Sequence, residues 1–544
     1  MQLLASHRPH QQTNYLLFFT LSSHTTMPNS INNKFHNQSI LLLLSLLLLL
    51  FPLVANSYNP DYNLAINCGS STNTALDKRI WVGDNIDNTN LFTFIESKTT
   101  SQSLKTQPNS LSNTQIPFTT ARVSLSNFTY SFSNIIANSP IFLRLHFYPT
   151  SYQNFEPTNA FFSVEVNNKL TLLKNFNPSL WLHDDENHIV KEYCIQTKPN
   201  EKLNITFIPS NINQSNVNYA FINGIEVVSM PSFLYYTNLS DTNYHLKSLD
   251  LHNTEYQIHN DKALEMLYRI NVGDNDVPPS NDTGMFRNWD NDFPRYLEKQ
   301  YPLSVSKDFA HHLNYLKNTI PNYTAPESVY LTARSYGMNA TKDYNVTWNF
   351  KVDSSFTYIV RLHFCEFDMN IKNPGDRVFQ IFIANTLAEE RADVIRWSGA
   401  RMVPVHKDYV VTMDSQRGSS QIKRVNLSIK LQRLPDTMHT RYRDVTLNGI
   451  EILKTSDKNN NLFGSNLQPI ISPMEQFLPI PTQKSKKSTL VIFAVAVVSC
   501  LMLASIVGMI VFAQRRRQSK SHIEMEATTW KTKNGGWRSL QSQR

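Results

Sequence analysis

One pattern occurs twice, in the same order, along the central part of this chain. Four short motifs of the first copy return in the second. The matched pairs are AINCG from Ala65 with RINVG from Arg269, TAR from Thr120 with TAR from Thr332, IFLRLHFY from Ile141 with YIVRLHFC from Tyr358, and NGIEVV from Asn223 with NGIEIL from Asn448. Two long copies indicate duplication of a whole domain and exclude a solenoid of short repeats. The chain is therefore expected to contain two similar folded units.

Both copies alternate apolar and polar residues with the period of a β-strand. Leu143, Leu145 and Phe147 alternate with Arg144 and His146, which places one apolar set on one face of a sheet. Residues 203–207 and 425–431 show the same period. Phe (31) and Tyr (23) are abundant and Gly (14) is scarce, a composition that favours strands. The sequence predicts a mainly β fold of two tandem β-sandwich or jelly-roll-like domains.

Breaks in these patterns predict the domain boundaries. The first domain is expected over residues 58–231 and the second over residues 266–455, with a polar connector at residues 232–265. Residues 456–489 are again polar and contain four prolines, a composition typical of an extended stalk.

Residues 1–57 have the features of a secretory leader. An apolar run of 15 residues, 40–54, is too short for a comfortable bilayer span, and the small residues Ala55-Asn56-Ser57 follow it. We expect cleavage before Tyr58, with an uncleaved N-terminal anchor as the alternative. Met27 is a second candidate for the first residue, because it opens a short polar start ahead of the apolar run.

A second apolar segment is long enough to cross a membrane. Residues 490–513 contain no charge over 24 positions, which corresponds to about 36 Å of helix. Lysines precede this segment and a cluster of arginines follows it, as is typical of membrane anchors. The predicted topology is a single-pass type I protein of the plasma membrane, with its N-terminal region outside and residues 514–544 as a short basic cytoplasmic tail.

Most of the net charge of +8 belongs to this membrane-proximal part. Eleven Lys and Arg residues lie from Lys484 onward, against the two acids Glu524 and Glu526. The remaining outer region is slightly acidic. The basic balance therefore indicates attraction to anionic membrane lipid and gives no reason to expect nucleic-acid binding.

Two repeated polar features are interpreted as structural. Asn-Gly before an apolar run resembles a tight turn into the closing strand, because both residues tolerate positive φ. Arg144 and Arg361 are flanked by apolar residues within predicted strands, and a buried guanidinium requires an acidic partner. We expect paired structural charges at these positions in preference to catalytic groups.

The ordered motifs resemble those of plant malectin-like receptor kinases of the FERONIA and THESEUS type. Besides the repeated motifs, the similarity includes LAINCGSS, RIWVGD, YRINVGDND, TGMFRNW, VRLHFCE and HKDYVV, and it extends from Tyr58 to about Arg517. The resemblance implies two tandem malectin-like domains at the cell surface that bind secreted cysteine-rich peptides of the rapid-alkalinisation type. It also implies a lipid-anchored co-receptor and wall pectin as partners.

No segment of this sequence matches the kinase domain of that family. There is no Gly-rich phosphate loop, no lysine in a VAIK setting, no HRD loop and no DFG motif. The first hypothesis is a ligand-binding receptor-like protein without its own kinase activity, acting as a decoy, a co-receptor or a truncated receptor. The alternative is the N-terminal part of a full-length serine/threonine receptor kinase whose kinase domain is missing from the gene model.

The residues give little support to enzymatic chemistry. Asp184, Asp185 and Glu186 are adjacent acids in a polar loop, a poor geometry for the two opposed carboxylates of a glycosidase. The 16 His residues show no metal-ligand spacing, so neither a metal nor another cofactor is expected. A carbohydrate-active enzyme is therefore the least favoured class.

Aromatic side chains are the candidates for ligand contact. Sugar recognition uses aromatic faces for CH stacking, although packing in a core is the competing interpretation of each ring. The five candidate ligand-binding residues are Tyr148, Tyr152, Trp181, Trp289 and Trp397.

Cysteines and sequons mark the modifications expected of a secreted chain. Cys68 and Cys194 share the first copy and are candidates for one disulfide, with free buried thiols as the alternative. Cys365 has no partner in its own copy, and Cys500 falls within the apolar segment. The candidate glycosylation sites are Asn127, Asn204, Asn213, Asn238, Asn281, Asn322, Asn339, Asn345 and Asn426.

Overall fold

The computed structural model describes residues 58–464, apart from short stretches. These stretches are residues 86–89, 107–114, 184–185, 211–216, 239, 241–245, 251–253, 299–301, 308–312, 316–319, 338–344, 415–421 and 436. The predicted leader, most of the predicted stalk, the apolar segment 490–513 and the basic tail lie outside the described residues. Within the described part of the chain, no helix is long and apolar enough to cross a membrane.

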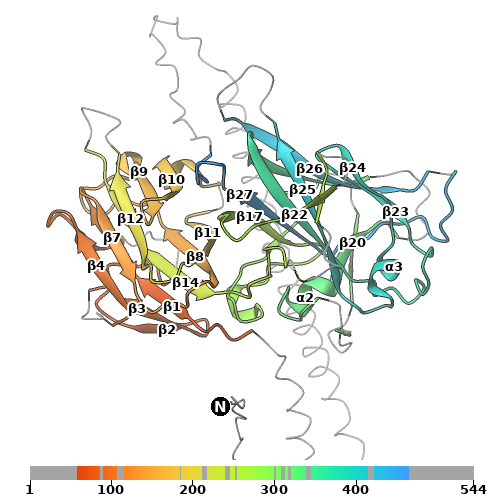
Figure 1. Ribbon diagram of the computed structural model, residues 1–544, viewed down its shortest axis with the longest axis horizontal. Helices are drawn as coiled ribbons and strands as arrows, with labels where there is room; N and C mark the ends of the chain where they lie inside the picture. The colour runs from red at the N-terminus through yellow and green to blue at the C-terminus, as the bar shows by residue number, and fades with distance from the viewer. Residues whose placement is uncertain are drawn as a thin grey trace, which may run out of the picture. The chain divides into compact units, whose positions relative to one another are not determined.

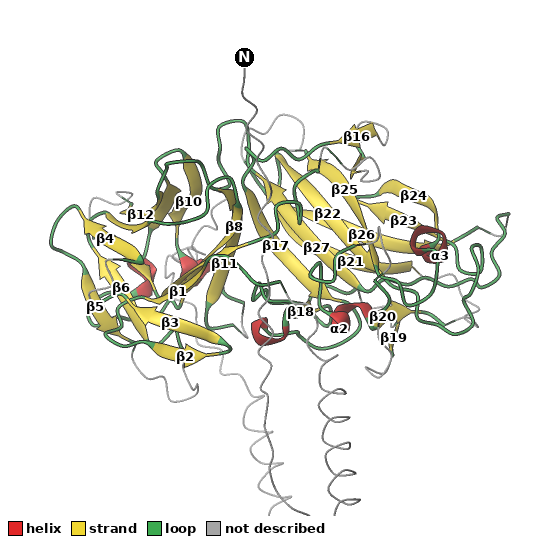
Figure 2. Ribbon diagram, turned by 60° about the horizontal axis from the view of Figure 1, so that its bottom comes forward, coloured by secondary structure: helices red, strands yellow, loops and turns green. Residues whose placement is uncertain are grey.

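Strands dominate the described residues, which confirms the mainly β prediction (Figure 2). In the first module, one sheet has the order β11-β8-β14-β1-β3-β2, a second β10-β9-β12-β7-β4, and a small third β13-β6-β5. The strands are β1 (Asn63–Asn67), β2 (Thr74–Leu76), β3 (Arg79–Gly83), β4 (Phe92–Glu96), β5 (Gln102–Lys105), β6 (Thr120–Ser124), β7 (Phe128–Phe132), β8 (Pro140–Phe147), β9 (Phe162–Val166), β10 (Leu170–Phe176), β11 (Ile189–Gln196), β12 (Leu203–Pro209), β13 (Ala220–Ile222) and β14 (Gly224–Ser229). Leu145 from β8 and Phe207 from β12 lie in one shared core, so the first two sheets form a sandwich.

The second module repeats this arrangement. One sheet has the order β25-β22-β27-β17, with β18 beside β17, and the other has the order β21-β26-β23-β24. The elements are β17 (Leu264–Asn271), β18 (Asp290–Asn291), β19 (Leu303–Ser306), β20 (Thr332–Ser335), β21 (Asn345–Asp353), β22 (Phe356–Phe364), β23 (Phe379–Ile383), β24 (Thr386–Ala392), β25 (Val405–Met413), β26 (Arg424–Arg433), β27 (Gly449–Thr455), α2 (Glu327–Tyr330), α3 (Val394–Ser398) and the short turn η4 (Pro279–Asn281). Two further short turns, η2 (Pro157–Asn159) and η3 (Pro178–Leu180), belong to the first module. Leu362 from β22 and Leu427 from β26 share its core.

The two modules share one sheet. The order β25-β22-β27-β17 continues directly into β11-β8-β14-β1, so strands of both modules lie side by side (Figure 1). The joint between them is short, because β11 and β17 pair antiparallel only through Glu192–Met266, Tyr193–Glu265 and Cys194–Leu264. Equivalent strands follow each other in the same order on either side of the joint, as expected for a duplicated domain.

The predicted connector contributes two strands to this sheet. β15 (Leu246–Ser248) pairs parallel with β25, and β16 (Thr254–Tyr256) pairs with β15. Tyr235 and Tyr236 of the same region are buried in a cluster at the junction of the modules. The connector is therefore largely a packed part of the fold.

In strand β8, the alternation of apolar and polar residues predicted the face that lies toward the core, but it did not predict that the opposite face is buried too. Leu143, Leu145 and Phe147 face the core of the first module, as the period of two predicts. The opposite face is buried as well, with Phe142 in the cluster at the module junction. All eight residues of β8 are buried. On the opposite face, Phe142 packs against Tyr235 of the connector, Arg144 donates to the Met285 carbonyl of the second module at 2.8 Å, and His146 packs against Trp81 of its own module.

The prediction of a tight turn at the two Asn-Gly pairs is wrong. Neither pair adopts positive φ, and a single residue, Asn223 at a bend, separates β13 from β14. The glycines are needed for space instead. A Cβ at Gly224 would lie 2.6 Å from Cγ of Pro117, and one at Gly449 would lie 2.8 Å from Cγ1 of Val329.

Candidate functional site

Ionised side chains from both modules meet in a buried cluster at the joint. Arg144 on β8 donates from Nε to Glu192 on β11 at 2.6 Å. Arg269 on β17 donates to the same carboxylate at 2.6 Å, and from Nε to Glu451 on β27 at 2.9 Å. All four side chains are buried. Glu192 thus bridges one arginine of each module.

Each module also contains its own copy of a histidine–glutamate contact. His146 and Glu226 lie 2.7 Å apart in the first module, and His363 and Glu451 lie 3.1 Å apart in the second. The histidines come from the repeated RLHF motif and the acids from the repeated NGIE motif. The duplication therefore preserved a pair of side chains as well as a fold.

The prediction that Arg144 and Arg361 are paired structural charges is confirmed. Arg144 contacts Glu192 and Glu226 at 2.6 and 3.4 Å. Arg361 makes a bidentate pair with Asp408, with both N–O distances at 2.8 Å. Such pairs compensate the cost of burying a guanidinium.

Burial and neighbouring charges shift the pKa values of the cluster and so determine which of its side chains are ionised. Burial alone would raise the pKa of Glu192, but Arg269 and Arg144 outweigh it and lower that pKa to about 2. Burial lowers the pKa of His363 to about 4, although its hydrogen bond to Glu451 acts in the opposite direction. At neutral pH these carboxylates are ionised and His363 is neutral. An acid–base catalyst works best with a pKa near the working pH, and the pKa values of Glu192 and His363 lie well below it. The cluster is therefore better suited to hold the two modules together.

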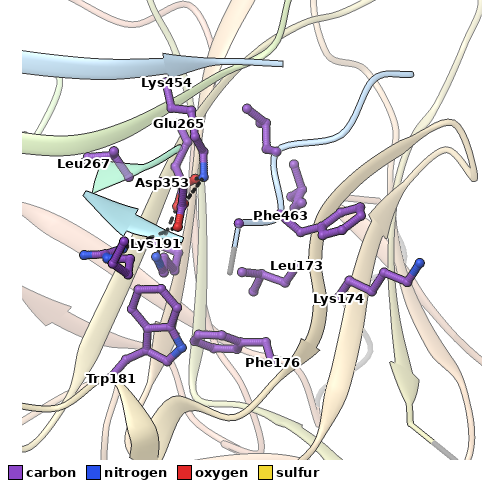
Figure 3. Close-up of a pocket in the computed structure, with 14 residues that line it drawn as sticks. Leu173, Lys174, Phe176, Trp181, Lys191, Glu265, Leu267, Asp353, Lys454 and Phe463 are labelled. Carbon is purple, nitrogen blue, oxygen red and sulfur yellow. Dashed lines mark hydrogen bonds and ion pairs between the residues drawn. The ribbon is translucent and has the colours of Figure 1, made fainter. Parts of the chain in front are cut away.

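A narrow cleft lies over the joint, on the sheet face opposite the cluster (Figure 3). Lys191 and Glu265 point into it, since they alternate with Glu192 and Met266 along β11 and β17. Its volume of ≈ 30 Å³ is enough for about one water molecule. The cleft is lined by Leu172, Leu173, Lys174, Phe176, Trp181, Lys191, Glu265, Leu267, Asp353, Arg424, Lys454, Leu462, Phe463 and Gly464.

A second hollow, of ≈ 250 Å³, belongs to the second module alone. It lies between the β19–β20 pair and the loop after β22, and its lining includes Glu366, Phe367, Met369 and Arg377. Arg377 donates to Glu366 at 2.7 Å, but its buried Nε has no hydrogen-bond partner among the described residues. Burial raises the pKa of Glu366 even so.

The five predicted aromatic contacts do not form one surface. Tyr148, Tyr152 and Trp289 are buried, with the Tyr152 hydroxyl donating to the Tyr148 carbonyl at 2.6 Å. Trp181 is half-buried beside the first core and lies in the cleft, where the Lys191 ammonium is 4.7 Å from its ring centroid. Trp397 is half-buried against the second core.

The candidate disulfide between Cys68 and Cys194 is absent, and both are free buried thiols, as is Cys365. Cys68 packs in the core of the first module and Cys194 in the cluster at the junction. Burial raises the pKa of both thiols. The alternative of free buried thiols therefore describes this structure.

The sequons differ in accessibility, and their glycosylation stays a prediction. Asn127, Asn281 and Asn426 are exposed. The half-buried ones are Asn204, Asn238, Asn322 and Asn345. Asn213 and Asn339 lie outside the described residues, as do Asp184, Asp185 and Cys500.

Several residues of the junction were not singled out from the sequence. Glu192 and Tyr235 are examples, and the hydroxyl of Tyr235, in the connector, donates to Glu451 of the second module at 2.5 Å. Glu226 and Glu451 did carry a signal, because both copies repeat an acid two positions after Asn-Gly. Glu192 had no such signal, since Asp408 is the corresponding partner in the second copy.

Fold and junction together define a duplicated β-sandwich protein whose modules share a sheet and a set of buried ion pairs. The chain belongs to the malectin-like family: the model of the Malectin-like domain matches residues 66–455. FERONIA, a receptor-like protein kinase of Arabidopsis thaliana, is 39% identical over 491 residues, covering 89% of this chain and 52% of that protein. The chain spans about half the length of the curated relatives that it matches.

Solved ectodomains of this family share the fold. The crystal structure of the plant receptor-like kinase FER matches with a TM-score of 0.64 and 37% identity, covering 75% of this chain and 100% of that one. The ANX2 ectodomain from Arabidopsis thaliana matches with a TM-score of 0.63 and 30% identity over similar shares. The FER chain in a complex of the plant peptide RALF23 with FER and LLG2 matches at 36% identity and a TM-score of 0.63, covering 76% of this chain and 100% of that one. The matched region in these relatives is their non-catalytic ectodomain.

Proposed function

We propose that this chain is a cell-surface receptor-like protein whose two modules bind a secreted cysteine-rich peptide of the rapid-alkalinisation type. The observation that supports this is the match to the FER chain solved with RALF23 and LLG2, which is covered over its full length. A lipid-anchored co-receptor takes part in the same complex on this proposal. The region from Tyr58 to about residue 489 is extracellular, and residues 490–513 anchor it in the plasma membrane as a type I protein.

The test is direct binding to the glycosylated ectodomain, residues 58–483. Basic cysteine-rich peptides should bind saturably, with or without a lipid-anchored co-receptor, and a reduced and alkylated peptide serves as the control. Binding that falls with rising salt would show an electrostatic contribution. Failure of every peptide to bind, with and without the co-receptor, contradicts the proposal.

Signal output follows one of two routes on this proposal, and each makes a different prediction. A receptor-like protein without kinase activity acts as a decoy or co-receptor through partner proteins. A longer receptor kinase would continue in frame after Arg544. Sequencing of full-length transcripts distinguishes the two, because only the second predicts coding sequence for a kinase there.

Wall saccharide such as pectin is a second candidate ligand, supported by the hollow in the second module. Glu366 and Asp368, both paired with Arg377, contribute carboxylates to its lining, and Phe367 and Met369 offer apolar contact. That combination suits a hydroxylated ring. Titration with pectin fragments should show binding that Asp368→Asn weakens several-fold and that Asp250→Asn leaves unchanged. Equal binding by both variants would rule out this hollow as the site.

A further inference from the structure

Residues 457–464 follow β27 and pack against the first module, although the strand before them belongs to the second. Leu462 is fully buried in the core of the first module. The Leu462 amide donates to the Thr171 carbonyl on β10 at 3.0 Å, and the Thr171 amide donates to the Asn460 carbonyl at 3.2 Å. The end of the second module is thus anchored in its neighbour.

The segment has its own local order. The Asp457 carboxylate accepts from the amides of Asn459 at 2.8 Å and Asn461 at 2.9 Å. The Asp457 amide donates in turn to the Asn461 carbonyl at 3.0 Å. This turn directs the following residue, Leu462, toward β10.

The last residues of the segment close the cleft over the joint (Figure 3). Phe463 lies beside Lys174 of the first module, with the ammonium 5.1 Å from the ring centroid. Gly464 lies against Asp353 at the end of β21 in the second module, where an added Cβ would come within 1.9 Å of the carboxylate oxygen. The segment therefore touches both walls of the cleft.

The joint itself is built like a hinge. Only three residue pairs connect β11 to β17. One face of this joint is supported by Arg144, Glu192 and Arg269. The other face is the cleft, where Lys454 holds Glu265 at 2.6 Å and Asp353 at 3.2 Å. A change of angle about the joint would separate β10 from the end of β21, and residues 457–464 bridge those two elements.

We propose that residues 457–464 act as a clasp that sets the angle between the two modules. While Leu462 is seated in the first core, the cleft stays closed and the modules move as one body. When the clasp is withdrawn, the modules pivot about the β11–β17 joint. Because the clasp is the first part of the predicted stalk, residues 456–489, the membrane-proximal chain and the module angle become linked.

The experiment uses the full chain in lipid nanodiscs, with spin labels introduced at the exposed positions Lys105→Cys and Glu390→Cys, one on each module. Two variants weaken the clasp by different means. Leu462→Asn removes its anchor, and Gly464→Ala crowds Asp353 without touching the core of the first module. Leu125→Asn, at a residue that is 43% exposed, is the control.

Both clasp variants should broaden the distance distribution between the labels, and the control should leave it narrow. Hydrogen exchange should rise at least about tenfold in β10 and in residues 457–464, and should stay unchanged in β7 and β22. An unchanged distance distribution despite faster exchange in β10 would overturn the proposal, because the segment would then be only a local cover. Faster exchange throughout the first module for Leu462→Asn, together with a silent Gly464→Ala, would overturn it as well.

Discussion

Asn223 and Asn448 each hold together segments that are distant in sequence. The side-chain oxygen Oδ1 of Asn448 accepts from the Cys365 backbone amide at 2.8 Å, and its side-chain nitrogen Nδ2 donates to the backbone carbonyls of Tyr330 at 3.0 Å and Thr332 at 2.8 Å. Asn223 makes the equivalent contact to the Tyr148 amide at 2.7 Å. The motif that suggested a turn is a buried cross-link, since the side-chain amide satisfies backbone groups where strands diverge.

Replacement of Asn448 by alanine should therefore destabilise the second module strongly. Three buried backbone groups lose their partner, and each such loss costs about 1–3 kcal/mol. We expect the free energy of unfolding of the ectodomain to fall by about 3 kcal/mol in urea denaturation. Asn187→Ala, at an exposed position, should change it by less than about 0.5 kcal/mol. Similar stabilities for the two variants would contradict this role.

The buried histidine of the second module makes stability depend on pH. Burial lowers the pKa of His363 to about 4, below the value of about 6.5 for an unfolded chain. The unfolded state therefore binds a proton in this window while the folded state does not, so stability falls as the pH drops from about 6.5 to 4.

The effect should amount to roughly 3 kcal/mol across that window. We expect the thermal midpoint of the ectodomain to decrease steadily with falling pH, and His363→Gln to show a shallower decrease regardless of its own starting stability. His439→Gln, at a residue outside the cluster, serves as the control. Parallel pH profiles for the wild type and His363→Gln would show that His363 does not titrate in this way.

At the scale of elements, the sequence predicted which segments form strands, but not which other segments pack against or pair with those strands. The period of two located the core-facing residues of β8, because that signal depends only on local alternation. It did not predict what covers the other face. A buried ion pair was expected for Arg144, but alternation alone does not identify the residues that pack over Phe142 and His146. The strands β15 and β16 were missed for a related reason: the connector is polar, and its pairing with β25 depends on the finished sheet.

Strand β15 should protect the edge of β25. The Leu249 amide, directly after β15, donates to the Val410 carbonyl on β25 at 2.9 Å. Leu249→Pro removes that donor, and Leu249→Ala removes the same side chain but keeps the amide. Hydrogen exchange in β25 should be faster in the proline variant than in the alanine variant, with β22 protected in both. Equal exchange in β25 would show that β15 contributes no protection.

At the scale of the whole molecule, the candidate site was predictable in part. The repeated RLHF and NGIE motifs supplied the histidines and two acids, and charge balance alone required partners for Arg144 and Arg361. The identity of Glu192 as the bridge could not be predicted, because it depends on which edge strand of one module meets which strand of the other. Tertiary pairing between modules leaves no periodic trace in a single sequence.

Removal of the charge on Glu192 should uncouple the modules. Glu192→Gln leaves Arg144 and Arg269 buried without their shared carboxylate, at a cost on the order of 3 kcal/mol. We expect calorimetry of the ectodomain to show two separate unfolding transitions in place of one. Glu201→Gln breaks an exposed pair with Lys169 and should leave a single transition. A single transition in both variants would indicate that other contacts suffice for coupling.

The joined sheet has a consequence for self-association. Both modules contribute strands in the same order, so the contact at β11–β17 is head-to-tail, and a head-to-tail contact that repeats gives a ring or an open-ended filament. Here the step occurs once. On β25, which corresponds to β11, the free edge is occupied by β15, and on β1, which corresponds to β17, the parallel strand β3 takes the neighbouring place. The same head-to-tail pairing therefore cannot recruit a further module at either end, because β15 and β3 already occupy the two positions where it would add a strand.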